Sequence, residues 1–243
     1  MHQQLLAKIP ALTTDQMKEV DRLMIEEYRI ELDQMMENAG RGLAELARRL
    51  SGGSVLGRSI TVLCGTGNNG GGGMVAARNL HNWGARVQAV LAGDAARLKE
   101  APKLRWETLE KLGLSCAAGA CPDPGTADMI LDAMLGYGME SDPRPPISNW
   151  IERTNSAGVP VLSLDTPSGL DATSGRPAVP CIRAAATLTL ALPKVGLLAS
   201  RAKPFVGELY LADIGVPAEL YAAPSLRISL DTLFAEDTIL RVR

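Results

Sequence analysis

The first fifty residues alternate apolar and polar positions with the period of an α-helix. A first helix is expected over about residues 16–28, capped by Thr13 or Thr14 with Asp15. Its apolar face comprises Met17, Val20, Leu23, Met24 and Tyr28. A second helix is expected over about residues 33–50 and contains Gly40. Because glycine costs up to ~1 kcal/mol inside a helix, Gly40 indicates close packing against a neighbouring element.

Beyond these helices, short apolar runs alternate with helical segments. Strands are expected at 59–64, 85–91, 129–132, 160–164, 186–190 and 209–212, and helices at 73–82, 95–111 and 146–156. Strands that are apolar on both faces and separated by helices favour a parallel sheet covered on both sides. We therefore predict one α/β domain over residues 1–243. Residues 222–243 are ambiguous and could supply an edge strand at 226–230 and a terminal helix.

Composition narrows the class of protein. The chain has 243 residues, of which 46% are hydrophobic and 21% charged, as in globular proteins with a substantial core. Its formal net charge of -2 argues against a general nucleic-acid binder. No apolar run approaches the roughly 20 residues that span a bilayer, and the first ten residues lack the apolar core of a secretory signal. We expect a cytoplasmic protein without a membrane or nucleic-acid partner.

The cysteines do not predict a metal site. Cys64, Cys116, Cys121 and Cys181 form no C-x-x-C pair, and neither of the two histidines lies near them in sequence. Reduced thiols of a cytosolic protein are the preferred interpretation.

The segment from Gly65 to Gly73 follows an apolar strand and precedes a helical run. It holds six glycines together with Asn68 and Asn69. Glycine lets the backbone approach a ligand, and a helix N-terminus presents free N–H groups to anions. The pattern G-x-G-x-x-G also matches a dinucleotide fingerprint, with Asp94 after the next strand. The alternative is a tight turn that only connects a strand to a packed helix.

Two further strand ends carry polar residues. Asp132 ends one apolar strand, and Asp165 ends another and is followed closely by Ser168. Ligands of parallel sheets bind at the carboxyl ends of strands, so these groups are expected to face the glycine-rich segment. Their hard oxygens suit an alkali ion or Mg²⁺ rather than zinc. The chain shows neither a Walker motif nor a G-x-S-x-G elbow.

Together these segments resemble the NAD(P)H-hydrate epimerase family, also called the YjeF N-terminal domain family. The resemblance runs from about residue 12 to residue 217, in family order. Its blocks are residues 13–27 with 36–40, 64–73, 131–136, 164–171, 192–198 and 213–217. Members of the family interconvert the R and S forms of hydrated NADH and NADPH, which are damaged cofactors.

The resemblance implies a Rossmann-like three-layer αβα sandwich, a homodimer and a bound potassium ion. By motif position the potassium ligands would be Asn69, Asp132 and Ser168, and Asp165 would be the acid/base residue. A separate NAD(P)H-hydrate dehydratase is the expected pathway partner. The hydrated nucleotide would contact Asn68, Asn69, Gly70, Gly71, Gly72, Gly136, Tyr137, Gly138, Met139, Glu140, Ser141, Asp142 and Asp165.

Three departures from the family pattern matter. Gly72 stands where an aspartate is usual, Tyr137 where a threonine is usual, and acidic residues near 140–142 where a basic residue is common. Gly72 favours an alternative hypothesis, a catalytically weakened nucleotide-binding or interaction module of the same fold. The glycine fingerprint alone would favour a third, an ordinary NAD-dependent oxidoreductase.

Overall fold

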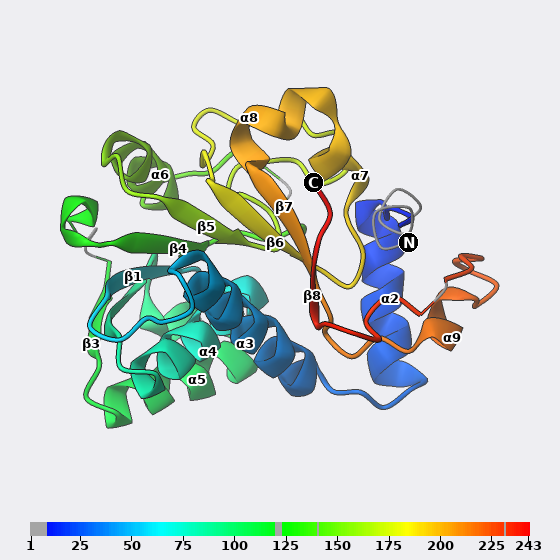
Figure 1. Ribbon diagram of the computed structural model, residues 1–243, viewed down its shortest axis with the longest axis horizontal. Helices are drawn as coiled ribbons and strands as arrows, with labels where there is room; N and C mark the ends of the chain where they lie inside the picture. Colours follow the sequence, from blue (N-terminus) through cyan, green and yellow to red (C-terminus); the bar gives the residue numbers. More distant parts are fainter. Residues whose placement is uncertain (1–8, 120–122, 140, 231) are drawn as a thin grey trace.

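The computed structural model describes residues 9–119, 123–139, 141–230 and 232–243. Within these residues eight strands form one sheet in the order β3-β2-β1-β4-β5-β6-β7-β8 (Figure 1). All neighbours pair in parallel except β8, which is antiparallel to β7. The strands are β1 (Ser59–Cys64), β2 (Arg86–Leu91), β3 (Ser115–Ala118), β4 (Met129–Ala133), β5 (Val161–Leu164), β6 (Ala186–Leu190), β7 (Glu208–Ala212) and β8 (Ile239–Arg241).

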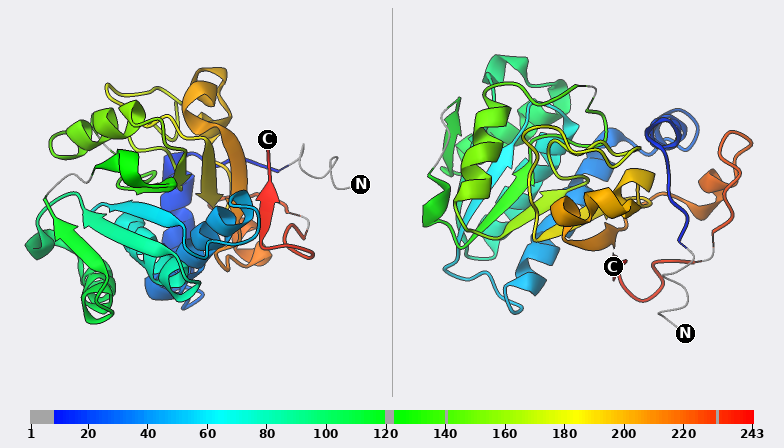
Figure 2. Two further views of the ribbon diagram at one scale, coloured as in Figure 1. Left: turned by 60° about the vertical axis from the view of Figure 1, so that its left-hand side comes forward. Right: turned by 90° about the horizontal axis from the view of Figure 1, so that it is seen from above.

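Helices cover both faces of the sheet (Figures 1 and 2). One layer holds α3 (Leu32–Leu50), α4 (Asn68–Asn82) and α5 (Glu100–Lys111), and the other holds α6 (Ile147–Ser156), α7 (Val195–Leu198) and α8 (Lys203–Val206). Helices α2 (Thr14–Glu26) and α9 (Ala218–Tyr221) pack together beside the carboxyl ends of β6 and β7, where Ala191, Leu192 and Ile214 join their apolar cluster. Three-residue 3₁₀ turns lie at Ala95–Arg97, Pro124–Thr126 and Ser200–Ala202. The predicted three-layer α/β fold is confirmed.

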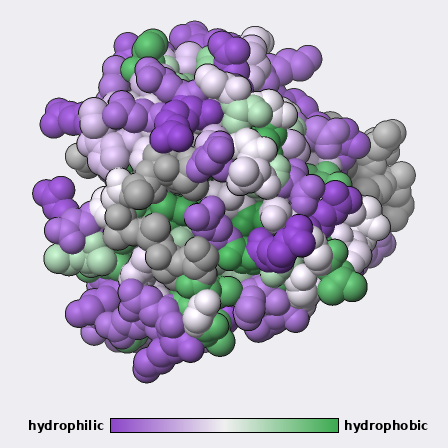
Figure 3. Space-filling view, turned by 90° about the vertical axis from the view of Figure 1, so that its left-hand side faces the viewer, coloured by the Kyte–Doolittle hydropathy of each residue, from purple (hydrophilic) through white to green (hydrophobic). Residues whose placement is uncertain are grey.

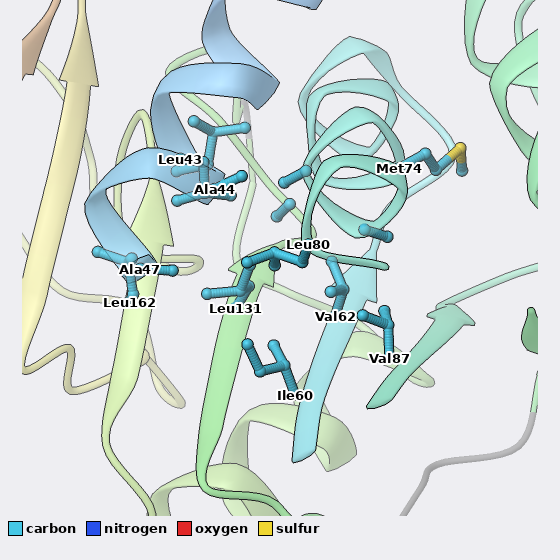
Figure 4. Close-up of a cluster of buried hydrophobic side chains, with 14 of the residues drawn as sticks. Leu43, Ala44, Ala47, Ile60, Val62, Met74, Leu80, Val87, Leu131 and Leu162 are labelled. Carbon is cyan, nitrogen blue, oxygen red and sulfur yellow. The ribbon is translucent and has the colours of Figure 1, made fainter. Parts of the chain in front are cut away.

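Alternation along the strands builds a separate core on each face. Ile60 and Val62 of β1 join the cluster formed with α3 and α4, which Figure 4 shows, whereas Leu63 joins Ile130 in the cluster under α6. Successive side chains of a strand point to opposite faces, so an apolar run without alternation is buried on both sides. This burial explains why β1 was predicted with its observed bounds.

Close contacts between helices rely on glycine. An ideal Cβ on Gly40 of α3 would lie 2.4 Å from the carbonyl oxygen of Gly72 in α4. Real Cβ atoms essentially never come so close, so the two helices could not approach this far with a larger residue at position 40. The expectation that Gly40 marks close packing is confirmed.

The structure corrects three local predictions. Helix α4 begins at Asn68 rather than at residue 73, so the asparagines and the glycines after them are helical. Strand β3 (Ser115–Ala118) was not predicted. The antiparallel edge strand is β8 (Ile239–Arg241) instead of residues 226–230, and residues 232–243 contain no helix. Leu226 instead packs into the apolar cluster around α2 and α9, and the buried side chains of Ile239 and Leu240 favour pairing with β7.

The face of the molecule shown in Figure 3 is mainly polar. On the face shown in Figure 3, hydrophilic residues surround smaller hydrophobic areas near the middle. None of the described helices combines the length and the apolar character needed to cross a membrane.

Candidate active site

A cavity of about 430 Å³ opens at the carboxyl ends of β1 and β4. These two strands are neighbours in the sheet, but the chain leaves them in opposite directions, which is where open α/β sheets bind ligands. Residues 66–69 and 134–139 form two of its walls. Helices α2 and α3 add apolar side chains, including Met17, Met35 and Met36. The cavity is thus mostly apolar with a few polar groups, as small-molecule sites usually are.

Asp165 lies in this cavity, directly after β5, and is only 3% exposed. Its backbone adopts φ 64°, a left-handed conformation that aspartate and asparagine tolerate better than most residues. Oδ2 accepts a hydrogen bond from the Tyr137 backbone N–H at 2.7 Å. The turn therefore directs a carboxylate into the cavity and fixes its orientation.

Lys194 holds the other oxygen of this carboxylate. Its Nζ lies 2.6 Å from Asp165 Oδ1 and donates a further hydrogen bond to the Leu190 carbonyl at 3.0 Å. The residue is 0% exposed. The backbone of Leu12 fixes its position, because Leu12 pairs with Lys194 in a parallel bridge. Burial of both charges is tolerable because they form an ion pair with additional hydrogen bonds.

Tyr137 connects the loop after β4 to α2. Its hydroxyl donates a short hydrogen bond to the Asp21 carboxylate, and its ring centroid lies 5.7 Å from Lys194 Nζ. Burial raises the pKa of Asp21, and the Tyr137 hydrogen bond opposes that rise. Burial and the charge of Asp21 raise the pKa of Tyr137. Tyr137 therefore covers the ion pair and anchors the cavity wall to α2.

A second polar cluster lies beneath the loop after β4. Asp132 is 0% exposed and accepts hydrogen bonds from Ser163 Oγ at 2.8 Å, Ser168 Oγ at 2.6 Å and Ser168 N–H at 2.9 Å. The Met134 N–H is a weaker fourth donor. Asp132 and Ser163 are partners in the β4–β5 register, which places them on the same face. Burial raises the pKa of Asp132, and all the donors that counter it are neutral.

Asn69 lies between this cluster and the cavity. Its side-chain amide donates to the Leu164 carbonyl at 3.3 Å, and it lines the cavity. An ideal Cβ on Gly136 would lie 3.3 Å from Asn69 Cγ and 2.9 Å from Asp165 Oδ2. Gly136 therefore leaves room for both the asparagine and the carboxylate, which a side chain at this position would crowd.

The glycines of α4 serve mainly in packing. An ideal Cβ on Gly70 would lie 1.8 Å from the Gly65 carbonyl oxygen, and one on Gly71 would lie 2.4 Å from Met36 Sδ. An ideal Cβ on Gly72 would lie 2.7 Å from Leu164 Cδ2. Leu164 lines the cavity and Gly72 does not. Gly72 occupies the position where the family has an aspartate, and in this chain the side chain of Leu164 separates it from the cavity.

The predicted nucleotide contacts divide into three groups. Those that line the cavity are Asn68, Asn69, Gly136, Tyr137, Gly138, Met139 and Asp165. Those that do not line it are Gly70, Gly71, Gly72, Ser141 and Asp142. Glu140 lies outside the described residues. Of the predicted potassium ligands, Asp132 and Ser168 are in contact with each other, and Asn69 belongs to the cavity wall.

Sequence reasoning missed two residues of the site, Lys194 and Asp21. The available signal for Lys194 was a lysine within the apolar run 191–198. For Asp21 it was a carboxylate one helical turn after Met17, on the apolar side of α2.

Two alternative chemistries receive no support from the described residues. The side chain of Asp94 accepts a hydrogen bond from the Ala96 N–H at 2.9 Å and caps a 3₁₀ turn, the role of a structural residue rather than of a ribose contact. No group of three or more histidine, cysteine or acidic side chains able to hold a metal ion occurs in the described part of the chain; Cys121 lies outside it.

The fold and this cavity define an α/β protein with a ligand site at the switch point of a parallel sheet. A family model described as YjeF-related protein N-terminus matches residues 32–196. The chain belongs to this family, as its sequence blocks predicted.

Several relatives are similar to this chain over most of its length. The chain is 42% identical over 219 residues to the NAD(P)H-hydrate epimerase of Dehalogenimonas lykanthroporepellens, covering 90% of this chain and 87% of that protein. It is 34% identical to the NAD(P)H-hydrate epimerase of Rhodopirellula baltica over 88% of this chain and 87% of that protein. Against the bifunctional NAD(P)H-hydrate repair enzyme Nnr of Moorella thermoacetica it is 38% identical over 87% of this chain but only 41% of that protein.

A solved structure agrees on the fold. The crystal structure of yeast ynu0 superposes with a TM-score of 0.81 over 96% of this chain and 100% of that chain, at 22% sequence identity. At this identity the likeness supports the architecture alone.

Proposed function

We propose that this protein is an NAD(P)H-hydrate epimerase that interconverts the R and S forms of hydrated NADH and NADPH. The observation that carries the proposal is Asp165, a buried carboxylate held at the cavity by the Tyr137 N–H and Lys194. Relatives named NAD(P)H-hydrate epimerase support it over most of the chain's length.

The chemistry requires a base that can also return a proton. Water adds to the enamine of a dihydronicotinamide at the carbon bonded to nitrogen, leaving a hydroxyl there. Asp165 would accept the hydroxyl proton while the carbon–nitrogen bond breaks, leaving a carbonyl and an electron pair on nitrogen that the ring carboxamide delocalises. Closure on the other face of the carbonyl takes the proton back and inverts the carbon. The Lys194 ammonium balances the negative charge at either stage.

The potassium site is part of the proposal. Asp132 is a buried carboxylate whose hydrogen-bond donors are all neutral, so a cation beside it would offset the cost of its burial. Asp132, Ser168 and Asn69 would hold the ion through oxygens, the donor type that hard cations prefer. Bound potassium would add positive charge close to an anionic substrate.

The weakened-module alternative rests on Gly72. Because Gly72 lies behind Leu164 and does not line the cavity, its missing carboxylate takes nothing from the present cavity wall. The enzyme interpretation is therefore preferred. The dehydratase partner fits the bifunctional repair enzymes among the relatives. The homodimer and the cytoplasmic location stay predictions.

One assay tests the activity. The protein is mixed with R-form NADPH hydrate and an S-specific dehydratase, and the return of NADPH is followed. We expect a rate well above spontaneous epimerisation, and a rate equal to it would refute the proposal. Asp165→Asn is the matched variant, because asparagine tolerates the left-handed backbone at this position. The variant leaves the buried Lys194 ammonium without its anion, so its fold is checked first by circular dichroism. The folded variant should lose most of the activity.

A further inference from the structure

The positively charged side chains around the cavity differ in whether a protein carboxylate already pairs with them. Among the residues that the structure describes, three lysines line it: Lys18, Lys99 and Lys194. Lys194 is buried and paired with Asp165. A substrate that inserts its nicotinamide ring beside Asp165 can place its phosphates at the N-terminus of α4, which has no side-chain cap, or beside the exposed Lys18 and Lys99.

Lys18 is the less suitable of the two. Its Nζ lies 3.9 Å from the Asp15 carboxylate, and Asp21 follows it on the same helix and also lines the cavity. These two carboxylates weaken the positive potential that Lys18 presents to an anion.

Lys99 has no such partner. Among the described residues no carboxylate lies within 4.0 Å of its amine, and its side chain is exposed. It is the N-cap of α5, which has no side-chain cap, so the positive end of the helix adds to the charge of the lysine. Glu100, the next residue, is acidic but forms no ion pair with Lys99. Of the described lysines that line the cavity, Lys99 is therefore the one without an ion-pair partner, which leaves its charge available to a ligand anion.

The loop after β4 forms another wall of the cavity and does not offer a cation to a phosphate. Asp142, in the loop after β4, is acidic and does not line the cavity, and it lies 4.0 Å from Arg176 in an exposed ion pair. Of the described residues in the loop after β4, those that line the cavity are residues 134–139, and none of them is basic, so this wall offers no cation to a phosphate.

We propose that Lys99 is a phosphate contact of this site, receiving a phosphate group of the dinucleotide whose nicotinamide end occupies the cavity. This assignment rests on the proposed function, because it takes its ligand class from that function. The phosphate is either the pyrophosphate common to both hydrates or the ribose phosphate found only in hydrated NADPH.

The test compares Lys99→Ala with Lys103→Ala in the coupled epimerase assay, using hydrated NADH and hydrated NADPH in turn. Lys103 is an exposed lysine one turn further along α5 that does not line the cavity, so it controls for the change in net charge. A lost charge-assisted contact should raise KM about tenfold without changing kcat. Lys103→Ala should leave KM within about twofold of the wild type.

The two substrates identify the phosphate. A KM increase for both hydrates assigns Lys99 to the pyrophosphate, and an increase for hydrated NADPH alone assigns it to the ribose phosphate. An unchanged KM for both, with an active wild type, overturns the proposal while the proposed function stands.

A binding measurement separates the two proposals if the wild type is inactive. Calorimetry with ADP and with 2′,5′-ADP should then give tighter binding to wild type and Lys103→Ala than to Lys99→Ala. Equal binding to all three proteins, or none, overturns the phosphate contact independently of any activity.

Discussion

Lys194 Nζ and Asp165 Oδ1 lie 2.6 Å apart, with side chains that are 0% and 4% exposed. Both charges come from loops at the same edge of the sheet, after β5 and β6. Removing one partner of a buried pair leaves an uncompensated charge, whereas replacing both removes the cost of burying either.

Lys194→Met should therefore destabilise the protein by about 3–5 kcal/mol in urea unfolding and abolish epimerisation. Adding Asp165→Asn to this variant should recover much of the free energy of unfolding, because no buried charge is left unpaired. The double variant should stay inactive. If its loss of stability equals or exceeds that of Lys194→Met, the two residues do not act as a pair.

The pH dependence of stability should report on Asp21. Burial raises its pKa above the ordinary value of 3.8, so the folded protein holds the proton more tightly than the unfolded chain. Its contribution to stability is full below that ordinary value and is lost as pH rises through the folded pKa. Asp21→Asn cannot titrate, so as the pH rises above the ordinary value of 3.8 it should lose less stability than the wild type does.

Asp15→Asn is the control for this measurement. Asp15 lies on the same helix, and its side chain is 94% exposed. Its stability profile should run parallel to that of the wild type. A profile for Asp21→Asn that also runs parallel would show that Asp21 keeps its ordinary pKa.

Substitutions at Gly72 test whether this position affects packing or catalysis. An ideal Cβ at this position would press on Leu164 Cδ2, the end of a side chain that can shift. Gly72→Ala should cost about 1–2 kcal/mol of stability, and Gly72→Asp more, because it also buries a carboxylate. Neither should raise the epimerisation rate. A faster Gly72→Asp, with Gly72→Ala unchanged, would show that the carboxylate reaches the substrate.

Potassium should stabilise the protein through Asp132. If the ion binds beside this buried carboxylate, the melting temperature should rise with KCl more than with choline chloride at equal ionic strength. Asp132→Asn should remove that difference. Because its amide would face donors such as the Ser168 N–H, this variant should also lose about 1–3 kcal/mol of stability. Equal melting temperatures in both salts for the wild type would contradict the potassium site.

The layers of the fold could be predicted because the patterns of apolar and polar residues that mark strands and helices are local in the sequence. Strand β6 (Ala186–Leu190) has apolar residues at alternate positions, and its predicted bounds match the structure. The proximity of Asp132 and Ser168 also followed, since the ends of neighbouring parallel strands meet at one edge. Helix α4 was misplaced because glycine has a low helix propensity, and only packing against distant backbone makes it helical.

The remaining parts of the site depend on contacts that no local pattern encodes. Tyr137 and Asp21 are 116 residues apart, and Lys194 and Asp165 are 29 residues apart. The sequence singled out Tyr137 only because it differs from the residue usual in the family. Its hydrogen bond to Asp21 depends on the packing of α2 beside the loop after β4, which no local pattern predicts.

The bridge between Leu12 and Lys194 makes backbone amides reporters of the active site. The Leu12 N–H donates to the Pro193 carbonyl at 2.8 Å, and the Val195 N–H donates to the Leu12 carbonyl at 2.9 Å. Exchange of either amide hydrogen with solvent deuterium requires this segment to detach, and detachment frees the backbone on both sides of Lys194. The protection of these two amides against exchange therefore reports the free energy needed to open the segment that carries Lys194.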